Sequence, residues 1–190
     1  MAAQNPIGPF VASISESCTD IEYSFTTIAD VPVKGSGTVK IQGDSFIMRG
    51  GGLEVWCDGK TSWTIDREAE ELIIAPIDSG TSASRTNPAL MLGTIDKYFT
   101  MKTMESVTES GVKVQKLELL PISDQTGIKF LTIWLKADGT SITKAEMETD
   151  DGVGMVFEFQ SIKFLPKISE DTFVFNDKNL GKSWVVTDLR

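Results

Sequence analysis

The chain has 190 residues and a formal net charge of −9, from 27 acidic and 18 basic residues, and it contains no histidine. The missing histidine excludes His-ligated zinc and the Ser-His-Asp and Cys-His pairs of common hydrolases. Because lysine and arginine are not clustered, binding to nucleic acid or to anionic lipid surfaces is disfavoured as the main activity.

The length favours one domain, residues 1–190, over two. No stretch approaches the roughly 18 apolar residues that cross a bilayer. The N-terminal sequence MAAQNPIGPF lacks the apolar core of a secretion signal, and its two alanines before Gln4 suit the end of a cleavage region. We therefore expect a mature chain from which a signal peptide has been removed.

The first element is predicted to be a helix. Phe10, Ile14 and Cys18 recur at a spacing of four residues, which places them on one helical face, and Pro9 suits the first turn. From residue 21 the pattern changes to short runs of strand-forming residues that alternate with turn residues. Strands are predicted over residues 21–29, 33–42, 45–48, 53–57, 60–66, 72–76, 99–107, 112–121, 129–137, 141–148, 155–165, 172–175 and 184–187.

Four of the connections carry the signature of tight hairpins: Gly43-Asp44, Asp58-Gly59, Asp138-Gly139 and Asp151-Gly152. Hairpins make the sheet antiparallel. The predicted helices are too few to cover a flat sheet of this size, so strong curvature is expected. The pattern is compatible with a sandwich, a closed barrel or a sheet that curves around something.

The hairpin VWCDGKTSWTID places two tryptophans beside one turn. With Asp58 and Gly59 as the two central residues, Trp56 would face Thr61 and Glu54 would face Trp63. Because sides alternate along a strand, one face of the hairpin is richer in large apolar groups. That face carries Trp56, Trp63 and Ile65 with Thr61 and Glu54.

Two later strands carry apolar residues on both faces. In IKFLTIWLKADG, Ile128, Phe130 and Trp134 share one side, and Leu131, Ile133 and Leu135 share the other. In GMVFEFQSIKFLP, the set Met155, Phe157 and Phe159 gives way to Ile162 and Phe164. This change of side predicts a bulge near Gln160 and Ser161.

A polar loop over residues 78–87 separates the two groups of strands, and the sequence NPALMLG follows it. Asn87 suits a helix N-cap, Pro88 the first turn and Gly93 the end, so a short helix is predicted. Its apolar residues favour a core plug, and a movable lid is the alternative.

The sequence offers no nucleophile elbow, phosphate-binding loop or calcium loop. Cys18 and Cys57 either form a disulfide or are both small buried hydrophobic residues, and the second interpretation is favoured. We therefore predict a protein that is not an enzyme and needs no cofactor or metal.

Three motifs in order resemble the periplasmic outer-membrane lipoprotein carrier (LolA-like) family: VWCDGKTSWTIDREAEELIIAPI, then NPALML, then FVFNDKNLGKSWVVTDLR. The resemblance implies a mainly β (α+β) fold, a strongly curved, incomplete antiparallel β-barrel covered by the N-terminal helix and the short loop helix. It implies a periplasmic carrier that shields lipoprotein acyl chains, or a similar lipid, in a hydrophobic cavity for transfer towards the outer membrane. The implied partners are an inner-membrane lipoprotein-releasing transporter and an outer-membrane acceptor, with the carrier acting as a monomer.

The cavity wall is predicted to combine the hairpin, the two helices and three later aromatic residues. Its members are Trp56, Trp63, Ile65, Leu90, Met91, Leu92, Phe10, Ile14, Trp134, Phe157 and Phe159. The alternative for each is a purely structural role in the core, and it is favoured for the three from the later strands. The alternative function is a periplasmic interaction or sensor protein on the same fold, with a cavity filled by its own side chains.

One position departs from the family pattern. The better-known carriers have an Arg-Pro pair, tied to lid opening, where this chain has Lys40 and Gln42, and Arg49 lies beyond the next turn. The release mechanism is therefore expected to differ.

Overall fold

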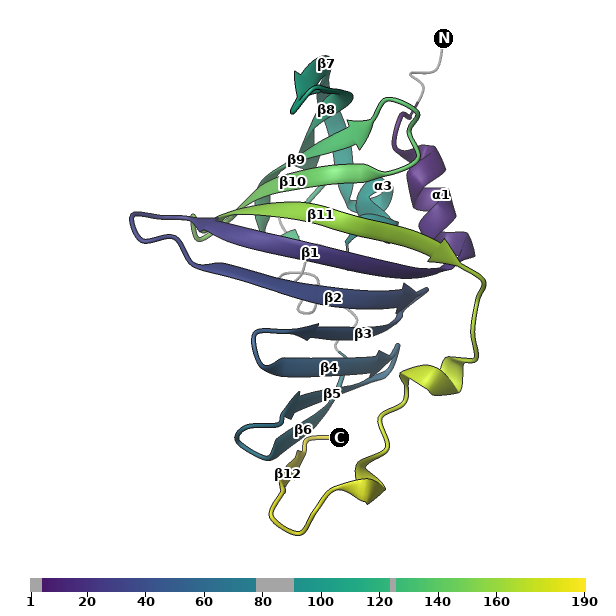
Figure 1. The fold of residues 1–190 in the computed structure, drawn as a ribbon, viewed down its shortest axis with the longest axis vertical. Coiled ribbons are helices and arrows are strands. Elements are labelled where there is room, and N and C mark those ends of the chain that lie inside the picture. Colours follow the sequence, from purple (N-terminus) through teal and green to yellow (C-terminus); the bar gives the residue numbers. More distant parts are fainter. Residues whose placement is uncertain (1–4, 78–90, 124–125) are drawn as a thin grey trace.

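The computed structural model describes residues 5–77, 91–123 and 126–190. One twelve-stranded sheet runs in the order β12-β6-β5-β4-β3-β2-β1-β11-β10-β9-β8-β7, with β12 and β7 at its edges (Figure 1). The strands are β1 Cys18–Ile28, β2 Lys34–Gln42, β3 Ser45–Gly50, β4 Leu53–Asp58, β5 Thr61–Asp66, β6 Glu71–Pro76, β7 Phe99–Glu109, β8 Val112–Pro121, β9 Ile128–Lys136, β10 Ile142–Thr149, β11 Gly154–Leu165 and β12 Val185–Asp188. The helical elements are α1 Gly8–Glu16, η2 Leu92–Thr94, α3 Ile95–Tyr98, η4 Glu170–Phe173 and η5 Asp177–Asn179.

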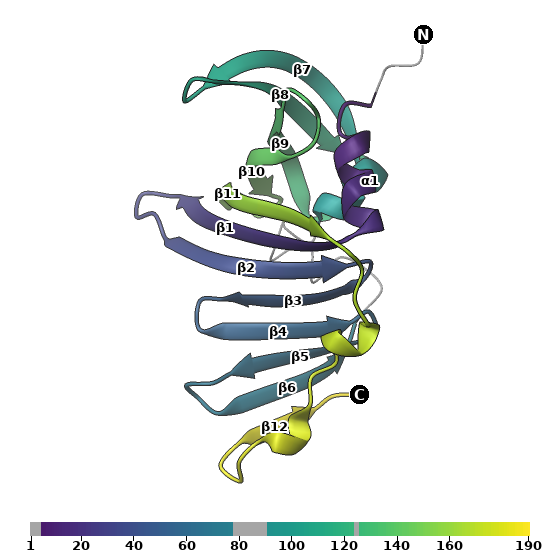
Figure 2. The ribbon, with the colours of Figure 1, turned by 45° about the vertical axis from the view of Figure 1, so that its right-hand side comes forward.

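The sheet is strongly curved and does not close, which confirms the predicted fold class. Figure 2 shows the bend most clearly at β7 and β8. We call the side that packs against α1 the inner face, and the opposite side the outer face. The main hydrophobic cluster lies on the inner face, where Phe10 and Ile14 of α1 pack with apolar residues of β1, β2 and β8–β11.

The hairpin between β4 and β5 forms as predicted, but its predicted register is wrong. Cys57 pairs with Ser62 and Trp56 pairs with Trp63, so the central residues are Gly59 and Lys60. Gly59 has φ +85°, which suits glycine at the first central position. The Asp58 carboxylate closes the turn because it accepts hydrogen bonds from the backbone N–H groups of Lys60 (2.9 Å) and Thr61 (2.7 Å). The shift keeps each side chain on its predicted face.

The bulge predicted in β11 is present. Glu22 of β1 pairs with Ser161, and Tyr23 pairs with Phe159, so Gln160 is the extra residue. The bulge lets Phe157, Phe159 and Ile162 all reach the inner cluster although their spacing changes.

The C-terminal segment, residues 166–190, differs from the prediction. Residues 172–175 were predicted as a strand, but η4 ends at Phe173, whose side chain is fully buried. The segment runs down one side of the sheet to β12 (Figure 1), which pairs with β6 in parallel rather than antiparallel fashion. Its large side chains cover the outer face of β4–β6 instead of adding an antiparallel strand.

Candidate functional site

A strip of partly exposed apolar residues runs along the inner face from β1 to β6. One row of facing residues crosses this part of the sheet: Ile21, Val39, Met48, Val55, Thr64 and Ile73. Ile21 and Val39 are buried, Met48, Val55 and Thr64 are half-buried, and Ile73 is 43% exposed. The cover on the inner face therefore ends part-way along the row. We call the partly exposed residues Phe25, Met48, Leu53, Val55 and Ile73 the apolar strip.

Two glycines of β2 make room for the aromatic rings at the β1 end of the apolar strip. A Cβ on Gly35 would lie 2.5 Å from the Phe25 ring, and one on Gly37 would lie 2.7 Å from the Tyr23 hydroxyl oxygen. Glycine at both positions therefore lets the two aromatic rings lie directly over the neighbouring strand. The Phe25 and Tyr23 rings in turn pack against Phe157, with ring centroids 5.9 and 6.0 Å apart.

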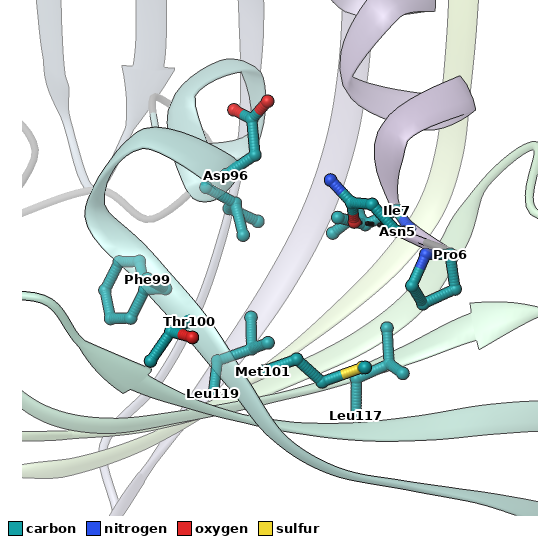
Figure 3. A pocket seen from close by; sticks show the side chains of 10 residues that line it. Asn5, Pro6, Ile7, Asp96, Phe99, Thr100, Met101, Leu117 and Leu119 are labelled. Carbon is teal, nitrogen blue, oxygen red and sulfur yellow. Dashed lines mark hydrogen bonds between the residues drawn. The ribbon is translucent and has the colours of Figure 1, made fainter. Parts of the chain in front are cut away.

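A pocket of about 290 Å³ opens on the same face, between residues 5–7, which precede α1, and the elements α3, β7 and β8 (Figure 3). Asn5, at the start of this wall, accepts a hydrogen bond from the Ile7 N–H (3.3 Å). Most of the lining is apolar, and Met101 on the edge strand β7 is 39% exposed. We call this the inner pocket; its lining is Asn5, Pro6, Ile7, Ile95, Asp96, Phe99, Thr100, Met101, Leu117 and Leu119.

The structure brings together about half of the predicted cavity residues. Six of the predicted residues belong to the main inner cluster: Phe10, Ile14, Met91, Leu92, Phe157 and Phe159. Leu90 and most of the predicted loop helix lie outside the described residues. Sequence reasoning missed the inner-pocket residues Met101 and Leu117, although both belong to predicted strands with alternating apolar residues.

The hairpin residues lie on the other side of the sheet. Trp63 and Ile65 form an outer cluster with Leu72 and Ile74, against which Trp56 packs. Phe175, Leu180 and Trp184 of the C-terminal segment cover this cluster. The Trp56 and Phe175 rings meet edge to face with centroids 5.7 Å apart. Trp134 also faces outward, but it lies on β9, in the other half of the sheet from the outer cluster on β4–β6. Its ring lies between the side chains of Lys116 and Lys144.

The family comparison agrees with this fold. The sequence profile described as "Outer membrane lipoprotein carrier protein LolA" matches residues 53–176. The chain belongs to the LolA family. No curated protein sequence matches this LolA-family chain.

Solved structures show the same fold at low sequence identity. A conserved protein from Thermus thermophilus is similar with a TM-score of 0.61 and 10% identity, covering 99% of each chain. A LolA superfamily protein from Nitrosomonas europaea has a TM-score of 0.52 and 13% identity, covering 92% of this chain and 98% of that one. A DUF1329 family protein from Desulfovibrio piger has a TM-score of 0.52 and 12% identity, covering 93% and 97%.

The residues at the departure from the LolA pattern face outward, away from α1. Lys40 forms an ion pair with Asp20 across β1 and β2. Gln42 hydrogen-bonds to the backbone of Ile168 in the C-terminal segment. Arg49 lies 3.3 Å from the Glu54 carboxylate, with its guanidinium 5.6 Å from the centre of the Trp56 ring. Arg49 therefore takes no part in the contact between α1 and the sheet.

The two cysteines are free, buried thiols on opposite faces of the sheet. Cys57 belongs to the inner cluster, and Cys18 packs with Ile47 and Phe173 on the outer face. Burial raises the pKa of the Cys57 thiol to about 11 and raises that of Cys18 as well. Both groups therefore stay protonated and contribute as small hydrophobic residues.

Within residues 5–77, 91–123 and 126–190, no cluster of histidine, cysteine or acidic side chains is arranged to hold a metal ion. In the same ranges, no helix has both the length and the apolar character needed to cross a membrane. What the inner face offers is apolar contact area, in the inner pocket and along the partly exposed apolar strip.

Proposed function

We propose that this LolA-family chain is a periplasmic carrier that shields lipoprotein acyl chains, or a similar lipid, during transfer towards the outer membrane. The observation that carries the proposal is the apolar inner face, on which Leu53 and Ile73 are 41% and 43% exposed beside a buried cluster. Family membership supports the same function.

The physical demand of such a function is large. Burying one CH2 group contributes about 0.8 kcal/mol, so a sixteen-carbon chain carries on the order of 12 kcal/mol of hydrophobic free energy. An acyl chain would enter beside Met101, which is half-exposed at the edge strand, and lie against Leu117 and Leu119. Methionine suits this role because its side chain adapts to ligands of varied shape.

Two partners follow from the proposal: an inner-membrane lipoprotein-releasing transporter that loads the carrier, and an outer-membrane acceptor that unloads it. The carrier would act as a monomer. The reaction needs no cofactor, because acyl chains move by partitioning between apolar surfaces and no covalent bond changes.

The test is native mass spectrometry of protein purified from cells, combined with titration of a fluorescent fatty acid. Met101→Asp introduces a charge in the inner pocket and is expected to weaken fatty-acid binding at least about tenfold. The matched control is Leu120→Asp, because Leu120 is 38% exposed against 39% for Met101 but faces outward on the neighbouring strand β8. Absence of both co-purified lipid and saturable binding would reject the carrier function.

A second candidate, a periplasmic interaction or sensor protein, is favoured by one observation. The side chains of α1 fill much of the space above the sheet, since Phe10 is fully buried and Ile14 is 3% exposed. Under this alternative the chain binds no fatty acid, and Met101→Asp and Leu120→Asp behave alike in the titration.

A further inference from the structure

A second pocket, of about 530 Å³, lies on the outer face of β7–β10. It is larger than the inner pocket and is separated from it by the sheet. We call it the outer pocket. Thr132 and Phe130 of β9 lie at its centre, between residues of β8 and β10. Thr132 is short and only 8% exposed, so it forms a floor between longer neighbours.

The outer pocket exists because the β7–β8 hairpin curls back over the outer face. Across the sheet, Lys144, Trp134, Lys116 and Glu105 face one another in one row. Glu109 lies four residues beyond Glu105, so a flat sheet would place it roughly 20 Å from Lys144. Instead, Lys144 Nζ lies 3.0 Å from Glu109 Oε1.

The curl also buries Trp134 on a face that would otherwise be open. Trp134 is 7% exposed, and Val114, on the same face of β8, is 3% exposed. Lys144 Nζ lies 4.2 Å from the centre of the Trp134 ring and Lys116 Nζ lies 5.9 Å from it. The ring is therefore held rigidly beside the pocket by cation–π contacts.

The charged residues that line the outer pocket divide into those with partners and those without. Lys116 pairs with Glu105 (3.5 Å), Lys129 pairs with Glu148 (2.7 Å), and Glu118 accepts a hydrogen bond from Thr103 (2.9 Å). Within the described ranges, Lys102 and Glu146 have no ion pair and no side-chain hydrogen bond. The pocket thus presents one unpaired cation and one unpaired carboxylate.

These two groups come from opposite walls. Lys102 belongs to β7, where it is the extra residue of a bulge between Met101 and Thr103, and Glu146 belongs to β10. The strands β8 and β9 lie between them and supply the apolar and hydroxyl surface of Phe130 and Thr132. A ligand with a single charge would pair with either Lys102 or Glu146 and leave the other side chain unpaired.

We infer that the outer pocket binds a small zwitterion, whose acidic group lies against Lys102 and whose ammonium group lies against Glu146, with an apolar spacer over Phe130 and Thr132. This site is independent of the proposed carrier function, because it lies on the opposite face of the sheet. A volume of about 530 Å³ falls within the range of ordinary small-molecule pockets.

The test uses ω-amino carboxylates of increasing length, namely 4-aminobutyrate, 6-aminohexanoate and 8-aminooctanoate. Binding is followed by the indole N–H resonance of Trp134 in nitrogen-15 NMR spectra, assigned by its loss in Trp134→Phe. At least one of the three compounds is expected to shift the Trp134 resonance saturably in the millimolar range, more tightly than hexanoate or hexylamine. The resonances of Trp56, Trp63 and Trp184 should not move.

Variants that remove one charge test the two proposed contacts and supply their controls. Lys102→Gln and Glu146→Gln should each weaken binding of the best compound about fivefold, the scale of a partly exposed ion pair. Lys113→Gln and Glu68→Gln remove exposed charges outside the pocket and should leave the affinity unchanged.

A competition experiment with palmitate distinguishes binding in the outer pocket from binding on the inner face. Saturating palmitate, which addresses the inner face, is expected to leave the Trp134 titration unchanged. The inference is overturned if no amino carboxylate shifts the Trp134 resonance, if hexanoate or hexylamine binds equally well, or if palmitate displaces the ligand. It is likewise overturned if the Lys102 and Glu146 variants bind like the two controls.

Discussion

Gln42 and Ile168 form a reciprocal pair of hydrogen bonds that imitates the pairing of two strands. Gln42 Nε2 donates to the Ile168 carbonyl oxygen, and the Ile168 N–H donates to Gln42 Oε1, both at 2.9 Å. Gln42 Nε2 also donates to a carboxylate oxygen of Glu170 at 2.6 Å. The residue that departs from the family pattern is therefore the anchor of the C-terminal segment.

Replacing Gln42 with alanine is expected to loosen the C-terminal segment. Gln42 is 4% exposed, and the change removes both of its hydrogen bonds to the backbone of Ile168, so it should lower the free energy of unfolding by about 1–3 kcal/mol. Urea denaturation measures the loss, and limited proteolysis should cut within residues 166–190 sooner than in the unaltered chain. Gln160→Ala is the control, because Gln160 is exposed and, among the residues that the structure describes, its side chain bonds only to the Ser24 hydroxyl. Equal effects of the two variants would contradict the anchoring role.

Trp63 is expected to support the C-terminal segment rather than to contact lipid. It is 6% exposed within the outer cluster, so Trp63→Ala should cost about 3–5 kcal/mol of stability. Trp63→Phe keeps most of the apolar volume and should bind a fluorescent fatty acid as the unaltered chain does, whereas Met101→Asp should not. If the Trp63→Phe chain folds normally but has lost fatty-acid binding, Trp63 contacts the lipid and this prediction is wrong.

The alternation along strands allowed the faces to be predicted correctly. Leu131, Ile133 and Leu135 lie together in the inner cluster, and Trp134 points the other way, because successive side chains of any strand alternate. Alternation does not determine which face a helix will cover. Both faces of β4 and β5 carry apolar residues, and one of them is covered by a segment more than a hundred residues away in sequence.

The C-terminal segment carried a signal for this cover that the prediction did not use. The segment holds four large apolar residues that do not repeat at one regular spacing: Phe173, Phe175, Leu180 and Trp184. Such residues need a separate apolar surface, and the face with Trp56 and Trp63 supplies it. The hairpin register was missed for a more local reason, because the Asp58 side chain bonds to the turn backbone and moves Gly59 to the first central position.

Cys18 and Cys57 are expected to remain free thiols even without reductant. They lie on opposite faces of the sheet, so their sulfur atoms cannot reach bonding distance without rearrangement of the strands. A thiol titration should find almost no reactive group in the native chain at pH 8, because both side chains are fully buried and burial raises the pKa of the Cys57 thiol to about 11. After denaturation two thiols should react, and finding none would demonstrate a disulfide.

Glu54 is expected to make the folded chain sensitive to acid. Burial opposes ionisation of its carboxyl, but hydrogen bonds from Arg67 and from the Trp56 indole N–H, together with the charges of Arg67 and Arg49, outweigh burial and hold the pKa of Glu54 below its ordinary value of 4.5. A carboxyl whose pKa is lower in the folded chain than in the unfolded chain stabilises the fold at pH values above its unfolded-state pKa. This contribution to stability is lost as the pH falls through its folded-state pKa.

The free energy of unfolding of Glu54→Gln should therefore differ from that of the unaltered chain most at neutral pH. The difference should shrink progressively below about pH 4.5, as protonation removes the ion pairs of Glu54 with Arg49 and Arg67. Urea unfolding at a series of pH values between roughly 3 and 7 measures this dependence. Glu68→Gln, an exposed change beyond the hairpin, controls for net charge. If the difference between Glu54→Gln and the unaltered chain stays constant over the whole series, the ion pairs of Glu54 do not stabilise the outer face of β4. The contact between β4 and the C-terminal segment would then depend on apolar packing alone.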